Sequence, residues 1–142
     1  MRKMFLYCLV ILISSLALAP SIFSEEVENK YSMGGIDSGA EVVTFLKALQ
    51  KAAAAGDKTT IATMIAYPLH AKVKVKGRLT AIKSKEAFLA NYDEIFNPSV
   101  KDAIQKATPD NLFVNYQGVM IGNGQVWFTT VDKMVKIITV NN

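Results

Sequence analysis

The stretch NYQGVMIGNGQVWF, residues 115–128, decides how the second half of this chain folds. It sets three glycines among large apolar side chains, which suits either a phosphate-cradling loop or a tight turn between two strands. A phosphate loop should lead into a helix whose amino end faces the anion, whereas strand-like residues flank these glycines on both sides. Asn123-Gly124 favours a two-residue hairpin turn, because both residues tolerate positive φ. We therefore predict a hairpin in which Met120 faces Trp127, Gly118 faces Thr129 and Tyr116 faces Val131.

Further strands are predicted on both sides of this hairpin. We expect the chain to end in an antiparallel meander of three strands, over residues 112–121, 125–131 and 133–140. Upstream, the sequence HAKVKVKGRLTAI, residues 70–82, alternates valine with lysine. That alternation predicts a strand, and Gly77-Arg78 predicts a turn into a partner strand over residues 79–82.

Helices are predicted in the remaining segments. Ser38 and Glu41 have the spacing of a capping box, and Gly56 is a natural stop for the helix between them. Its inward stripe comprises Val42, Phe45, Leu46, Leu49, Ala52 and Ala53. Asp57 caps a short second helix, a third is expected from Ser84 to Phe96, and Pro98 opens a fourth.

The first residues have the layout of a secretory signal peptide. Arg2 and Lys3 precede an apolar run over residues 4–19, so we expect a signal peptide over residues 1–24, with an uncleaved anchor as the alternative. Residues 25–37 are predicted to be a flexible leader and residues 38–142 a single domain. This layout predicts a periplasmic or secreted protein with no stable membrane span after cleavage.

Composition excludes several kinds of site. Cys8, the only cysteine, lies in the signal segment, so disulfides and cysteine metal sites are not expected in the exported chain. A single histidine excludes histidine clusters, and we expect no metal and no cofactor. Residues 25–142 carry 14 basic and 12 acidic side chains, a balance that predicts no nucleic-acid partner.

The order of elements is α+β and resembles the NTF2-like (SnoaL-like, cystatin-like) superfamily. The segments YPL, YDEIF-P and GVMIG-GQVWF also look like parts of small exported bacterial proteins that mostly carry no assigned activity. The resemblance implies a curled antiparallel sheet wrapped around helices into a cone. In that superfamily the cone serves as an enzyme pocket, a ligand carrier or a dimer surface, so a homodimer is one arrangement it allows.

Six residues are candidates for lining such a pocket. His70 could act as a general acid or base, because imidazole titrates near neutral pH. The resemblance implies an acidic residue pointing into the cone, for which Asp132 is the candidate, although a solvated turn carboxylate is the ordinary alternative. Aromatic side chains could line the pocket or fill the core. The candidates are Tyr67, His70, Tyr92, Tyr116, Trp127 and Asp132.

A basic stretch is the one conspicuous charge feature of the sequence. It comprises Lys72, Lys74, Lys76, Arg78, Lys83 and Lys85, with no acidic residue between His70 and Ser84. It could bind an acidic partner or an anionic envelope surface. Alternatively, the lysines could protect an edge strand from aggregation, which is the interpretation that we favour from the sequence.

These features predict an exported, non-catalytic binding or protective module. Its partner would be a protein or a small apolar ligand. Two alternatives remain open at this point: a cofactor-free lyase or isomerase that uses the cone pocket, and an immunity or inhibitor protein directed against a toxin or hydrolase.

Overall fold

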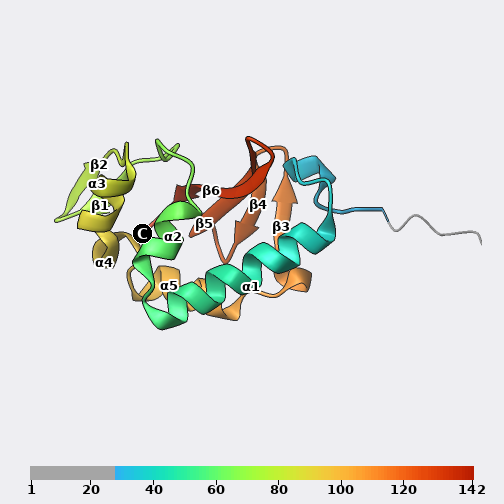
Figure 1. The fold of residues 1–142 in the computed structure, drawn as a ribbon, viewed down its shortest axis with the longest axis horizontal. Coiled ribbons are helices and arrows are strands. Elements are labelled where there is room, and N and C mark those ends of the chain that lie inside the picture. The colour runs from blue at the N-terminus through green and yellow to red at the C-terminus, as the bar shows by residue number, and fades with distance from the viewer. Residues whose placement is uncertain (1–27) are drawn as a thin grey trace, which may run out of the picture.

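Helices and antiparallel sheets form an α+β structure over residues 28–142, the part of the chain that the computed structural model describes (Figure 1). The α+β class predicted from the order of elements is confirmed. The predicted signal peptide and the first residues of the predicted leader lie outside the described residues. No helix within residues 28–142 combines the length and the apolar character needed to cross a membrane.

The longest helix, α1 (Gly39–Ala55), begins and ends where it was predicted, but the reciprocal Ser38–Glu41 capping box is not formed. The Ser38 hydroxyl accepts a hydrogen bond from the Ala40 N–H at 3.2 Å, and Gly56 ends the helix at φ +65°. The helix α2 (Lys58–Thr63) follows at once, capped by the side chain of Asp57. The apolar stripe of α1 predicted from the sequence is buried throughout: Val42, Phe45, Leu46, Leu49, Ala52 and Ala53.

The predicted third helix is wrong as a single element. It is divided into α3 (Lys85–Ala90) and α4 (Tyr92–Ile95), with Asn91 between them in a non-helical conformation. The Asn91 side chain donates a hydrogen bond to the Ala87 carbonyl at 2.8 Å, and such local bonds compete with the helical ladder. The fourth helix, α5 (Pro98–Lys106), begins at Pro98 as predicted and leads into a short 3-10 helix, η2 (Pro109–Asn111).

Two antiparallel sheets carry the strands. A separate hairpin pairs β1 (Val73–Val75) with β2 (Arg78–Thr80), and the larger sheet has the order β3-β4-β5-β6. The members of the larger sheet are β3 (Phe113–Asn115), β4 (Gly118–Ile121), β5 (Val126–Val131) and β6 (Met134–Val140).

The central hairpin has the predicted register but a different turn. Met120 pairs with Trp127, as expected. The last paired residues of β4 and β5 are Ile121 and Val126, so the loop between the strands has four residues. In this loop Gly122 and Gly124 adopt positive φ, whereas Asn123 does not. The two glycines therefore supply the backbone conformations that we had assigned to the Asn-Gly pair.

The predicted strand over residues 112–121 is also wrong, because it folds back on itself as β3 and β4. Asn115 pairs with Gly118, and Tyr116 and Gln117 form the turn between them. The Asn115 side chain accepts a hydrogen bond from the Gln117 N–H at 2.8 Å, which stabilises this turn. Tyr116 consequently lies at the turn and does not face Val131.

Part of the predicted flexible leader is packed against the domain. It forms a 3-10 helix, η1 (Ser32–Gly34), flanked by Tyr31 and Ile36, which are both buried in the core. The Tyr31 hydroxyl donates to the Pro109 carbonyl at 3.1 Å. A side chain on Gly34 would come within 3.0 Å of the Gly118 backbone, so this segment approaches the sheet more closely than other residues would allow.

The core lies between α1 and one face of the larger sheet (Figure 1). The rings of Phe45 on α1 and Phe128 on β5 lie 4.8 Å apart between centroids. The segment after α2 runs parallel to β6, with a bridge between Ile65 and Ile137. This segment covers the β6 edge of the sheet and brings His70 next to it, since the His70 N–H donates to the Ile138 carbonyl at 2.8 Å.

Candidate functional site

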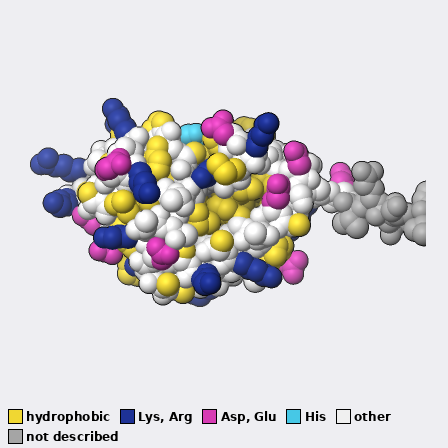
Figure 2. All heavy atoms as spheres, viewed as in Figure 1, with side chains coloured by type: hydrophobic (Ala, Val, Ile, Leu, Met, Phe, Trp, Pro, Cys, Tyr) yellow, Lys and Arg dark blue, Asp and Glu magenta, His cyan; other side chains and the backbone are white. Residues whose placement is uncertain are grey.

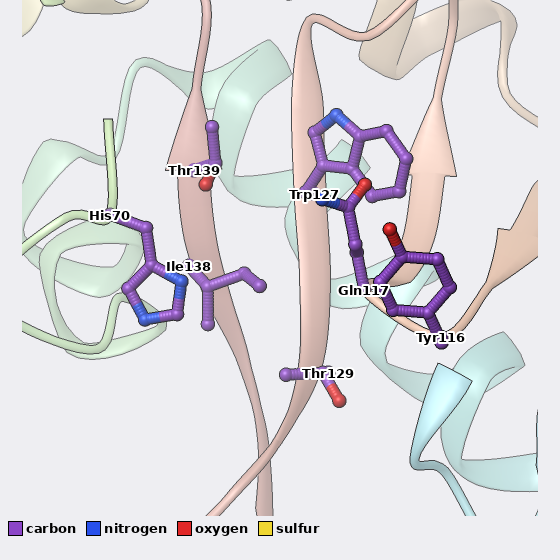
Figure 3. Close-up of a pocket in the computed structure, with 7 residues that line it drawn as sticks. All are labelled: His70, Tyr116, Gln117, Trp127, Thr129, Ile138 and Thr139. Atoms are coloured by element: carbon purple, nitrogen blue, oxygen red, sulfur yellow. The ribbon is translucent and has the colours of Figure 1, made fainter. Parts of the chain in front are cut away.

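A pocket of about 520 Å³ lies on the face of the larger sheet that α1 does not cover (Figure 3). We call it the sheet pocket. Three parts of the chain build it: the segment before β1, the β3–β4 turn, and the strands β5 and β6. Its lining residues are His70, Tyr116, Gln117, Trp127, Thr129, Ile138 and Thr139.

Strand alternation explains why Trp127 and Thr129 point into this pocket. Successive side chains on a strand project to opposite faces. Val126 and Phe128 are fully buried on the α1 side, so Trp127 and Thr129 project to the other side, where both are half-buried. The pairing also continues across the sheet, from Phe113 and Met120 through Trp127 to Thr139, which forms a largely apolar row beside the pocket.

An irregularity in β6 places two successive residues at the pocket. Trp127 pairs with Thr139 while Phe128 pairs with Ile137, so Ile138 has no partner on β5. Such a bulge shifts the alternation of the strand. Ile137 therefore joins the core, whereas Ile138 and Thr139 both line the sheet pocket.

The β3–β4 turn supplies the opposite wall. Gly118 has φ +140°, and a side chain there would come within 2.7 Å of the Phe128 carbonyl oxygen. Glycine therefore lets the chain turn against β5 and presents Tyr116 and Gln117 to the pocket (Figure 3). Tyr116 is 84% exposed, so its phenol ring is available to a ligand.

The pocket is lined by hydrogen-bonding side chains and apolar surfaces. Its polar side chains are the amide of Gln117, the hydroxyls of Thr129 and Thr139, and the imidazole of His70. The Thr129 hydroxyl donates to the Gly34 carbonyl at 2.7 Å, which ties this wall to η1. None of the seven lining residues is a lysine, an arginine or a carboxylate.

The structure brings three of the six pocket candidates together and places the others elsewhere. His70, Tyr116 and Trp127 line the sheet pocket. Asp132 lies in the two-residue β5–β6 turn, exposed and with φ +49°. It is therefore a turn residue and does not point into a cone.

The remaining two candidates are tyrosines that pack with the core. The Tyr67 hydroxyl donates to the Ala62 carbonyl at 3.0 Å, and burial raises the pKa of this phenol to about 12. Tyr92 is buried between Phe88 and Phe96, with ring centroids 5.8 and 5.5 Å away. Burial, followed by the charges of Asp93 and Asp57, raises the pKa of Tyr92. Its hydroxyl has no hydrogen-bond partner among the described residues.

Four lining residues were not singled out from the sequence. Gln117 lies in the turn at residues 116–117, where the apolar pattern predicts a continuous strand. Thr129 was placed on the Trp127 side by the predicted register, and that register was the available signal for it. Ile138 and Thr139 come to the pocket through the bulge, for which strict alternation gives no signal.

A metal site is not formed within residues 28–142, where no three His, Cys, Asp or Glu side chains lie close enough to hold an ion.

No family model matches the chain, and comparisons with curated proteins and with solved structures found no match. The function must therefore be inferred from the geometry of the chain itself.

Proposed function

We propose that this protein is an exported binding module that holds a small uncharged ligand in the sheet pocket. The observation that carries the proposal is the composition of the pocket wall. A half-buried indole, Trp127, and an exposed phenol, Tyr116, stand beside hydrogen-bonding side chains, and no lysine, arginine or carboxylate is among the lining residues. Apolar surface with a few polar groups that fix orientation is typical of small-molecule sites.

The same wall favours binding over catalysis. General acid–base chemistry usually needs a titratable group and a second group that orients it or takes the opposite role. His70 is the one histidine among the lining residues, and no carboxylate lines the pocket beside it. A cofactor-free lyase or isomerase is the second candidate, because His70 does lie at the pocket.

We further propose that the fold is a divergent NTF2-like arrangement. Three features support this: the order of elements, the packing of α1 on one face of the sheet, and the segment parallel to β6 that extends the sheet beyond its four strands. Export is proposed from the signal-like layout of residues 1–24.

Fluorescence of Trp127 gives a direct test, because it is the only tryptophan in the chain. The protein would be titrated with uncharged saccharides and with neutral aromatic compounds. Native mass spectrometry of freshly purified protein would reveal a ligand that copurifies. We expect a saturable change in Trp127 emission, and recovery of the ligand chemically unchanged.

Two variants keep the tryptophan and locate the effect. Gln117→Ala and His70→Ala remove exposed polar groups from the pocket wall, and Lys47→Ala, on the exposed side of α1, is the matched control. We expect the first two to weaken binding and the control to leave it unchanged. Binding that neither pocket variant affects would refute the proposed site, and chemical conversion of the ligand that His70→Ala abolishes would favour the enzyme.

A further inference from the structure

Several lysine and arginine side chains project into solvent at the end of the molecule formed by β1, β2 and α3, with a few acidic side chains between them (Figures 1 and 2). Residues 72–85 contain six basic residues and no carboxylate, and the next residue, Glu86, is an exposed carboxylate on α3 that forms no ion pair with them. We call this surface the basic end; its members are Lys72, Lys74, Lys76, Arg78, Lys83 and Lys85.

The edge-protection hypothesis does not fit the position of the lysines. Lys74 lies on β1, which pairs with β2 on one side. On the other side the Asn142 side chain acts as a strand partner. It accepts from the Lys74 N–H at 2.7 Å and donates to the Lys74 carbonyl at 2.6 Å. Both sides of β1 are therefore occupied, so its lysines do not guard an open edge.

The charges of the basic end are not neutralised by contacts within the described residues. Over residues 28–142 the one ion pair joins Lys106 and Asp102, on α5. Glu94 is the carboxylate that contacts the hairpin, and it accepts a hydrogen bond from the backbone N–H of Lys76. That contact fixes the β1–β2 turn and leaves the Lys76 ammonium group free in this part of the chain.

An exposed leucine lies among these cations. Val73 and Val75 are buried, so the lysines that alternate with them face solvent. Leu79 pairs with Lys74 in the register of the hairpin, which places both on the same face, and Leu79 is 69% exposed. An exposed apolar side chain beside lysine ammonium groups matches the boundary between anionic headgroups and acyl chains.

The type of cation favours a lipid surface over a defined acidic protein site. Five of the six basic residues are lysines. Lysine is a flexible point charge, whereas recognition of individual carboxylates in fixed positions favours the planar fork of arginine. A diffuse negative surface needs only many such charges at short range.

We propose that the basic end is a docking surface for an anionic lipid bilayer, with Leu79 in the headgroup region and the lysines at its surface. This role is independent of the sheet pocket, which is built from other residues. Docking would hold the pocket close to the membrane surface.

Co-sedimentation with vesicles tests the proposal. The full exported chain would be mixed with vesicles of phosphatidylcholine alone, or of phosphatidylcholine with phosphatidylglycerol, over a range of salt concentrations. We expect binding to the anionic vesicles only, weakened as salt screens the charges. Replacing Lys72, Lys74 and Lys76 by glutamine should weaken partitioning by about a hundredfold, since each lysine near an anionic surface contributes about 1 kcal/mol.

A second triple variant controls for net charge. Lys47, Lys51 and Lys58 are exposed residues of α1 and α2. Their replacement by glutamine removes the same charge and should leave vesicle binding nearly unchanged. Leu79→Ser should weaken binding by about tenfold at every salt concentration, because insertion of an apolar side chain is not screened.

Three results would overturn the proposal. These are no binding of the wild type to anionic vesicles at low salt, equal losses in the two lysine variants, and binding to soluble polyglutamate as strong as to vesicles with no effect of Leu79→Ser. The last result would assign the surface to acidic polymers or proteins. Circular dichroism checks that each variant is folded. We expect the lysine variants to fold, because exposed charges contribute little to stability.

Discussion

Neighbouring aromatic residues on β5 should differ sharply in their contribution to stability. Phe128 is fully buried and packs against the tilted ring of Phe45, so Phe128→Ala should lower the free energy of unfolding by about 3–5 kcal/mol. Trp127 is larger, but it is half-buried on the other face and is not part of the core cluster. Because its indole lies on the pocket face, outside the core cluster, and keeps part of its surface in water, Trp127→Ala should cost less, about 1–2 kcal/mol.

Urea denaturation followed by circular dichroism distinguishes these values. With a dependence of about 2 kcal/mol per molar urea, the midpoint should fall by about 2 M for Phe128→Ala and by less than about 1 M for Trp127→Ala. Circular dichroism is needed because the second variant lacks the only tryptophan. Equal midpoint shifts would show that the indole is core, and the assignment of the open face to a binding site would then fail.

Two further predictions concern residues that tie segments together. Asn142→Ala removes two hydrogen bonds to Lys74 and one to the Glu94 carbonyl. It should cost about 1–2 kcal/mol in urea denaturation, with a selective loss of hydrogen-exchange protection at the Lys74 amide. The pKa of Tyr67 is raised to about 12, from 10 in the unfolded chain, so stability should fall as pH rises from 10 to 12. Tyr67→Phe should lessen this loss of stability, whereas Tyr116→Phe, at an exposed tyrosine, should not. The same dependence of stability on pH in the wild type and both variants would contradict this.

Local signals in the sequence were sufficient for some of the regular elements. The helix α1 begins after Ser38 and ends at Gly56 because a hydroxyl cap and a glycine stop act on adjacent backbone groups. The pairing of Met120 with Trp127 was likewise predictable, because a short glycine-containing loop sets the register of the strands that it joins. The α+β class followed from the order of such elements.

Local signals failed where a side chain competes with the backbone. Asn91 interrupts an apolar stripe that reads as one helix, and Asn115 turns a stretch that reads as one strand. Both residues act through a single side-chain hydrogen bond to a nearby backbone group. Periodicity reports which faces are apolar, but it does not show whether such a bond forms.

The sequence by itself therefore determined the ends of the longest helix, the central register and the positions of the charges. Only the tertiary structure decided which surfaces are open. The bulge that brings Ile138 and Thr139 to the sheet pocket depends on the pairing of β6 with β5. The covered edge of β1 depends on Asn142, which lies 68 residues away from Lys74 in the chain. Caps and turns act between neighbours in sequence, whereas a pocket wall or a covered edge exists only after distant segments have packed together.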